Sequence, residues 1–210
     1  MKRIFWGSAA LCLVALPAWA ADAPKSATYI TPEDMQKVMQ LNGGPALENA
    51  IRMMDMGKDY QLSATMIYRG STEKPKPTPV RDPARPAPVA KTPCGEAVAP
   101  TGAKIAQADM LSHDDLGEIY IITKGEGTIV TGGTMFGGST LTSNNIGPSC
   151  SGKVYGDFEA RSLKVGDTVV LPQGVPHGFS DIPNEVEYLN FRIDSKHVLP
   201  SGTVSPALKK

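Results

Sequence analysis

Residues 166–177 read Gly-Asp-Thr-Val-Val-Leu-Pro-Gln-Gly-Val-Pro-His. Gly166 allows a tight turn into a short strand that is rich in β-branched residues. Pro172 and Gly174 then make a rigid corner where the sheet folds over. That corner directs the imidazole of His177 toward the interior. The stretch therefore predicts a turn, a short strand and a rigid corner that ends at His177.

Other segments also read as short strands separated by turns. Residues 60–69 alternate with period two, and the run from 118 to 131 reads as two strands joined by a turn at 124–127. The glycine-rich segment 132–156 is expected to be mostly loop. Repeated short strands favour an antiparallel sandwich or barrel over βαβ units. The expected strands are residues 60–69, 118–123, 128–131, 168–171 and 186–193.

The stretch that ends at His177 resembles the second motif of the cupin superfamily, Gly-x5-Pro-x-Gly-x2-His-x3-Asn. It matches at every position through the histidine, and Asp181 stands where the motif ends in asparagine. The resemblance covers roughly residues 104–193. It implies an all-β fold, a cupin-like antiparallel β-barrel of the jelly-roll type, preceded by short N-terminal helices. It also implies a possible homodimer through an edge strand, for which residues 60–69 are the candidate.

An earlier stretch resembles the first cupin motif, with His113 as its second histidine, Glu118 as its carboxylate and Gly125 as its last glycine. Leu111 occupies the position of the first histidine. His113 and Glu118 are an odd number of residues apart, which on a straight strand would put them on opposite faces. The turn-forming residues 114–117 allow a bend that brings both inward.

Two imidazoles and one carboxylate match a facial metal site for Fe(II), Mn(II), Ni(II) or Zn(II). The predicted ligands of this divalent metal are therefore His113, Glu118 and His177. Leucine at position 111 leaves a coordination position open, as substrate-binding metal sites require. The alternative is that both histidines are structural and the barrel holds no metal. Asp114 and Asp115 are either extra oxygen ligands or, as we prefer, a solvated turn.

Strand parity gives further candidates for the substrate pocket. Tyr120 lies on the face of Glu118, and Phe179 lies on the face of His177. In the last strand Tyr188, Asn190 and Arg192 share a face, which is either the barrel interior or the solvent side. In the interior, Arg192 could hold an anionic substrate. Tyr120 is a weak candidate for a catalytic proton donor, because its ordinary pKa near 10 would have to fall.

The N-terminal residues read as a signal peptide. Lys2 and Arg3 precede an apolar run, and Ala18-Trp19-Ala20 is a small-x-small cleavage site. We therefore expect cleavage after residue 20, a periplasmic or secreted protein, and no stable membrane insertion of the mature chain. Cys12 leaves with the signal. In an oxidising compartment the remaining Cys94 and Cys150 are expected to form a disulfide, the alternative being two buried free thiols.

We divide the rest of the chain into an N-terminal helical segment (21–58), a barrel (59–200) and a C-terminal tail (201–210). The helical segment should start at Thr31-Pro32 and include a second helix over 46–54. A proline-rich insertion at 73–93 should loop out of the barrel. Because 21 basic residues balance 21 acidic ones, nucleic acid is excluded as the main partner.

These features give three hypotheses for function. The first is a metal-dependent enzyme on a small molecule, since the resemblance implies dioxygenase, isomerase, decarboxylase or lyase chemistry. The second is a non-catalytic barrel that binds or senses a small ligand, with or without metal. The third is an interaction module whose proline-rich segment 73–93 docks a partner.

Overall fold

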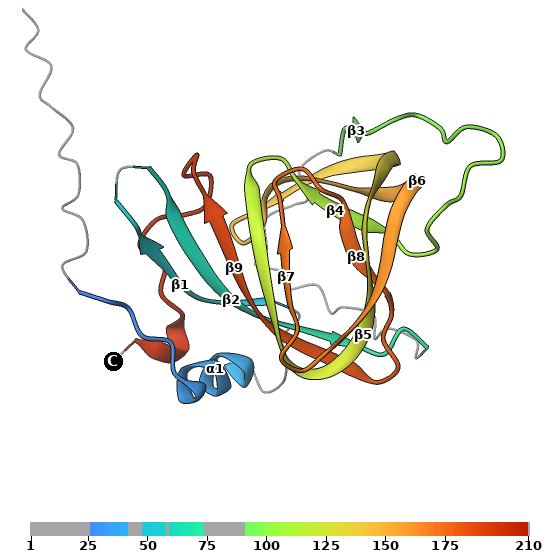
Figure 1. The fold of residues 1–210 in the computed structure, drawn as a ribbon. Helices are drawn as coiled ribbons and strands as arrows, with labels where there is room; N and C mark the ends of the chain where they lie inside the picture. The colour runs from blue at the N-terminus through green and yellow to red at the C-terminus, as the bar shows by residue number, and fades with distance from the viewer. Residues whose placement is uncertain (1–25, 42–47, 58, 74–90, 210) are drawn as a thin grey trace, which may run out of the picture.

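Antiparallel strands in two connected sheets make up most of the computed structural model, which describes residues 26–41, 48–57, 59–73 and 91–209 (Figure 1). One sheet has the order β1-β2-β9-β5-β7, and the other is built from the far part of β5 with β3, β4, β6 and β8. The all-β prediction is confirmed. The strands are β1 (Glu48–Asp55), β2 (Gln61–Gly70), β3 (Pro93–Cys94), β4 (Met110–His113), β5 (Leu116–Ser143), β6 (Gly147–Lys164), β7 (Thr168–Leu171), β8 (His177–Asp181) and β9 (Glu185–Asp194).

The predicted hairpin over residues 118–131 is wrong, because this segment is the first part of one long strand, β5. Up to Gly125 it pairs with β9, and from Glu126 onward it pairs with β6. At Gly125 the chain passes from one sheet to the other with a φ of 70°. A Cβ there would overlap the carbonyl oxygen of Glu185, so the glycine permits the close approach of the two backbones. A glycine that looked like a turn is a bend within a strand.

The predicted loop at 132–156 is also wrong. These residues form the end of β5 and most of β6, joined by a short turn before Gly147. The pairing shifts register after Gly132 and again between Phe136 and Ser139. Gly132 and Gly133 have φ angles of 86° and 80°. The glycines therefore supply β-bulges, which curve a long hairpin around the barrel.

The N-terminal segment contains one of the two predicted helices. Helix α1 (Pro32–Met39) begins at Thr31, whose side chain accepts a hydrogen bond from the Asp34 N–H in a capping box. The second expected helix is wrong, because its described residues, 48–54, lie in β1, which pairs along β2. Ile51 of β1 is buried beneath α1, and this packing overrides the local propensity.

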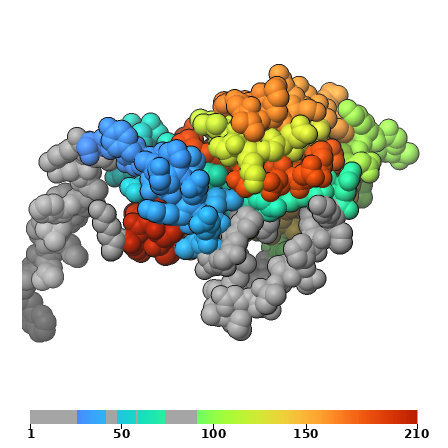
Figure 2. Space-filling model, turned by 90° about the horizontal axis from the view of Figure 1, so that it is seen from below, coloured from blue at the N-terminus to red at the C-terminus, as the bar shows by residue number. Residues whose placement is uncertain are grey.

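Strand β2 lies between β1 and β9, so the prediction that it is a free edge for a second subunit is wrong. The expected C-terminal tail is also ordered against the same region. Thr203 and Ser205 hydrogen-bond to the backbone of β1, and the short 3-10 helix η2 (Pro206–Leu208) lies beside α1 (Figure 2). These segments cover the outer face of β1, β2 and β9.

The largest apolar cluster lies between the two sheets. It joins Tyr120, Leu171 and Tyr188 of one sheet to Ile129 and Leu163 of the other. Burial of these side chains is the main favourable term that holds the barrel closed. The predicted signal peptide (residues 1–20) and residues 74–90 of the proline-rich insertion lie outside the described residues. Among the helices that the structure describes, none is long and apolar enough to cross a bilayer.

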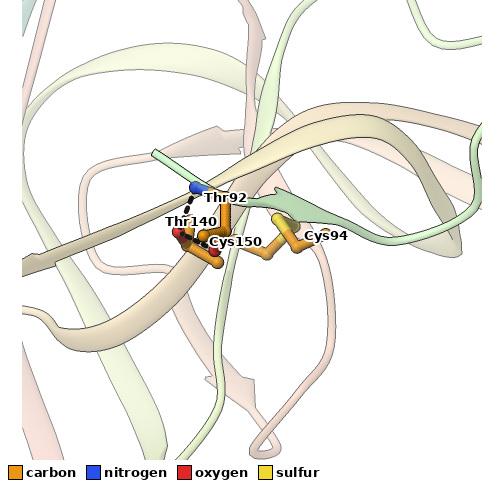
Figure 3. The surroundings of a disulfide bond; sticks show 4 residues. All are labelled: Thr92, Cys94, Thr140 and Cys150. Atoms are coloured by element: carbon orange, nitrogen blue, oxygen red, sulfur yellow. Dashed lines mark hydrogen bonds between the residues drawn. A yellow bond between two sulfur atoms is a disulfide. The ribbon is translucent and has the colours of Figure 1, made fainter. Parts of the chain in front are cut away.

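The structure pairs Cys94 with Cys150, with Cα atoms 6.0 Å apart (Figure 3). Thr92 and Thr140 hydrogen-bond to each other through backbone and side chains beside the bridge. The bridge thus fastens the short strand β3 and its neighbouring loop to the β5–β6 hairpin.

Removing this bridge should destabilise the protein substantially. We expect the double variant Cys94→Ala/Cys150→Ala to lose about 2–4 kcal/mol of unfolding free energy, because the disulfide closes a long loop in the unfolded chain. Denaturant unfolding of both proteins, with and without a reductant, measures the loss. Reductant should weaken the wild type and leave the variant unchanged. Equal stabilities of the oxidised wild type and the variant would contradict the prediction.

A buried carboxylate ties the end of β9 to the C-terminal segment. Asp194 accepts hydrogen bonds from the side chain of Gln61 (2.8 Å) and from the N–H groups of Val198 and Leu199 (3.0 and 2.9 Å). Burial alone would raise the pKa of Asp194, but these donors lower it below its ordinary value.

Because the folded-state pKa of Asp194 is depressed, its contribution is fully present above pH about 4 and is lost as the pH falls through the folded-state pKa. We expect Asp194→Asn to cost about 1–3 kcal/mol at pH 7, and the difference from wild type to shrink in acid. Urea unfolding at pH 7 and pH 3 measures both. The exposed Asp109→Asn serves as the control, with an expected change below about 0.5 kcal/mol. A constant difference at both pH values would contradict the assignment.

Candidate metal centre

Three strands bring the predicted ligand residues together in the barrel interior. His113 ends β4, Glu118 lies near the start of β5 and His177 starts β8. The bend at 114–115 breaks the strand alternation, so His113 and Glu118 both face inward, as predicted. The corner after β7 delivers His177 to the same place. All three side chains are at most 5% exposed.

The carboxylate of Glu118 lies between the two imidazoles. Its Oε2 atom is 3.2 Å from Nε2 of His113 and 2.9 Å from Nε2 of His177. The ligand atoms of the three residues all lie within 4.8 Å of one another. Two ligands bound at right angles, each about 2.1 Å from a metal ion, are about 3.0 Å apart. The spacing therefore suits ligands on one face of a divalent ion.

The far sides of both rings are held by the protein. Nδ1 of His113 lies 3.0 Å from the carbonyl oxygen of Ile146 and 2.8 Å from Oγ of Ser149. Nδ1 of His177 lies 2.9 Å from the carbonyl oxygen of Val175. Because a carbonyl oxygen only accepts, each Nδ1 carries the proton. In the neutral rings the Nε2 lone pairs then point at the carboxylate, an arrangement that needs a cation or an added proton between them.

The second oxygen of Glu118 is fixed by β9. Oε1 accepts from Nδ2 of Asn190 (2.7 Å) and from Nε of Arg192 (2.8 Å), while the hydroxyl of Tyr120 donates to Oε2 (3.0 Å). Burial would raise the pKa of Glu118, but the hydrogen bonds that His113 and His177 donate when Nε2 also carries a proton, together with the charge of Arg192, hold it well below its usual range. The carboxylate is therefore ionised and ready to bind a cation.

The polar face of β9 lies inside the barrel and not on the solvent side. Tyr188, Asn190 and Arg192 are buried, so the polar set lines the interior. Arg192 is already engaged, because Nη1 lies 2.7 Å from a carboxylate oxygen of Glu48 and donates to the carbonyl of Asn145 (2.8 Å). Burial would lower its pKa, but the carboxylates of Glu48 and Glu118 raise it. Its charge is directed at the protein's own acids.

The aromatic candidates pack beside the centre. The Tyr120 ring lies 5.9 Å from that of His177 and 4.5 Å from that of Tyr188, and Phe179 lies 5.8 Å from Tyr188. Burial and the negative charge of Glu118 raise the pKa of Tyr120 well above 10, and burial raises that of Tyr188 to about 12. Tyr120 thus becomes a weaker acid, the opposite of what a proton donor needs.

Other residues considered from the sequence lie elsewhere. Leu111 pairs with His177 across β4 and β8 and offers no ligand. Asp115 forms an ion pair with Lys196 (2.6 Å), and Asp114 and His197 are exposed. Among the described residues, only His113, Glu118 and His177 form a cluster able to hold a metal.

Sequence reasoning missed two supporting residues, Glu48 and Ser149. Glu48 reaches the centre through Arg192, and Ser149 contacts His113 from the neighbouring strand β6. Neither lies near a motif, so their roles depend on strand register. Register could have been guessed for Ser149 only if the β5–β6 hairpin had been recognised.

Comparison with known proteins gives matches among solved structures alone. No family model matches the chain, and no curated protein matches it. The inward His177 at the Pro-Gly corner, facing His113 and Glu118 inside an antiparallel barrel, agrees with both motifs at once. The fold is an antiparallel β-barrel, the architecture that the resemblance to the two cupin motifs implies.

Three matches illustrate how distant the similar structures are. BH2720 from Bacillus halodurans is 11% identical, with 87% of this chain and 92% of that chain covered and a TM-score of 0.40. The DMSP lyase DddQ from Ruegeria pomeroyi DSS-3 is 16% identical (80% and 50% covered, TM-score 0.32). An oxalate oxidase is 17% identical (67% and 44% covered, TM-score 0.28). Identities and TM-scores this low carry no activity over to this chain.

Proposed function

We propose that this chain is an exported cupin-barrel protein that binds one divalent metal ion through His113, Glu118 and His177 and acts on a small molecule. The observation that carries the proposal is the orientation of the two imidazoles. Both Nδ1 protons are held by backbone carbonyls, so both Nε2 lone pairs converge on an ionised carboxylate. The proposed reaction is of the dioxygenase, isomerase, decarboxylase or lyase type.

The fit of the donor set supports a metal from the middle or end of the first transition row. Two imidazole nitrogens and one carboxylate oxygen suit Fe(II), Mn(II), Ni(II) or Zn(II). A bound ion of this kind supplies Lewis acidity at its open coordination positions. The protein's own part is to hold the ligands. Ser149 and the carbonyls orient the rings, and Asn190 and Arg192 fix the carboxylate.

A non-catalytic, metal-free barrel is the second candidate, and one observation favours it. The contacts of 2.9 and 3.2 Å between the carboxylate and the imidazoles are also hydrogen-bond lengths, provided that a ring is protonated at Nε2. In that case the three residues form a buried ion pair network and the barrel binds its ligand elsewhere. The two candidates differ in whether the centre takes up a cation.

Metal analysis separates the two candidates. The mature chain, residues 21–210, is purified from the periplasm without a tag or a nickel column, and its metal content is measured. The metal-stripped protein is then titrated with Mn(II), Fe(II) under argon, Ni(II) and Zn(II). We expect saturation at one equivalent per chain. Absence of metal at isolation together with no uptake in any titration would overturn the proposal. A redox-active metal at isolation would direct the substrate screen to reactions with oxygen.

Export is tested separately. We expect the intact mass of the purified protein to equal that of a chain beginning at Ala21, less the two hydrogens lost on disulfide formation. A full-length chain in the cytoplasmic fraction would contradict export. The homodimer remains a prediction, now without β2 as its edge.

A further inference from the structure

A hollow of about 310 Å³ lies between β5, β6 and β7, outside the candidate metal centre. We call it the β7 hollow. Ile129, Leu163 and Val169 line its apolar part, and Thr131, Glu159 and Arg161 contribute polar side chains. An apolar surface with a few polar groups is the usual composition of a small-molecule site.

The β7 hollow shares a wall with the metal centre. In the pairing of β5 with β8, Thr131 is directly opposite His177 and Ile129 is directly opposite Phe179. Directly opposed residues of an antiparallel pair point to the same face, so Thr131 lies beside the imidazole-bearing position. The apolar lining also belongs to the same core cluster as Tyr120, whose hydroxyl donates to Glu118. Thr131 therefore connects the hollow to the strand position that faces His177.

Two opposite charges face this hollow without a protein partner. Arg161 is opposite Ile129, and Glu159 is opposite Thr131, so both share the inward face of the hairpin. Both side chains are exposed, and neither forms a hydrogen bond or ion pair with a described residue. Asp167, by contrast, accepts from the N–H of Lys164 (2.9 Å) and pairs with its ammonium group (3.8 Å). The free charges of the hollow are one guanidinium and one carboxylate.

We propose that the β7 hollow binds a small zwitterion of the amino-acid class, with its carboxylate on Arg161 and its ammonium group on Glu159. This deepens the proposed function, on which it rests, by naming the class of molecule that the metal centre receives. A guanidinium binds a carboxylate bidentately. Glu159, about 7 Å along the same strand, repels a second negative charge and so disfavours dicarboxylates. Arg161 would thus bind the ligand's carboxylate, the role that the sequence suggested for Arg192. The guanidinium of Arg192 is instead paired with Glu48 and Glu118.

Three small probes test the class of ligand. L-Alanine carries both charges, propionate carries only the carboxylate, and ethylamine carries only the ammonium group. Each is titrated into the metal-loaded mature protein and followed by amide chemical shifts in NMR. We expect saturable binding of L-alanine at residues around the β7 hollow and binding at least about tenfold weaker for each single-charge probe.

Matched variants assign the two charges. Arg161→Gln should weaken L-alanine binding at least about tenfold. Glu159→Gln should weaken L-alanine to a similar degree yet leave propionate unweakened. Lys153→Gln removes one positive charge from the same strand outside the hollow and should change neither. All three positions are exposed, so the variants are expected to fold.

Three outcomes would overturn the inference. These are the absence of L-alanine binding to the wild type, equal binding of propionate and L-alanine, and unchanged binding in Arg161→Gln. Metal uptake is measured on every sample. Loss of alanine binding with full metal uptake overturns the inference about the hollow and leaves the metal proposal standing. Absence of metal uptake by the wild type overturns the proposed function itself, whatever the alanine titration shows.

Discussion

Replacing His177 by alanine is expected to abolish metal binding by the mature protein. The variant keeps one imidazole and one carboxylate, and the loss of a direct ligand should weaken affinity by more than about a hundredfold, the upper end of what supporting residues alone cost. Metal content at isolation and a titration of the stripped protein measure the change. Uptake of one equivalent with unchanged affinity would show that the imidazole does not bind the ion.

The control is another histidine of the same chain. His197 is exposed beyond β9, so His197→Ala should bind metal as the wild type does. A variant that failed to fold would also lose metal, and His177→Gln guards against this because its amide can still contact Glu118. If both His177 variants unfold at the wild-type temperature when stripped of metal, yet neither takes up metal, the loss belongs to the ligand and not to the fold.

The candidate centre was predictable because its ligands depend on local chain geometry. The Pro172–Gly174 corner fixes the direction of His177 within a few residues, and the bend at 114–115 fixes His113 relative to Glu118. Such features leave a sequence signature. Alternation along β9 likewise placed Tyr188, Asn190 and Arg192 on one face, but it gave no way to decide which face was internal.

The parts that failed depend on contacts between residues distant in sequence. Gly125 and Gly133 look the same in sequence as glycines of a loop, and only the approach of another backbone shows that they bend a strand. Glu48 lies two strands away from Arg192 in the order β1-β2-β9, and the ion pair between them becomes visible only in the folded structure. For the same reason the sequence does not show that Arg192 has ion-pair partners whereas Arg161 has none among the described residues. Alternation along a strand shows which side chains share a face of the sheet. The partners of those side chains depend on how the strands pair.

Replacing Arg192 by methionine should be the most destabilising change near the centre in the metal-free protein. Methionine keeps much of the side-chain length but removes the charge that lies between Glu118 and Glu48. Breaking a buried pair from one side leaves an uncompensated charge, and the expected cost is about 3–5 kcal/mol at pH 7. Urea unfolding of the stripped wild type and variant measures it. Arg161→Met, on an exposed arginine, should cost less than about 0.5 kcal/mol.

Two further measurements show that the cost comes from charge. The double variant Arg192→Met/Glu118→Gln should recover part of the stability, because it removes one of the two carboxylates that lost their partner. The second measurement is the pH dependence of the unfolding free energy. In the wild type the folded-state pKa of Glu118 is depressed, so its contribution is present above pH about 4.3 and is lost as the pH falls through the folded-state value. Without Arg192 that pKa rises, so the deficit of the variant should shrink in acid. A deficit that is independent of pH and is not relieved in the double variant would mean that Arg192 stabilises the barrel by packing alone.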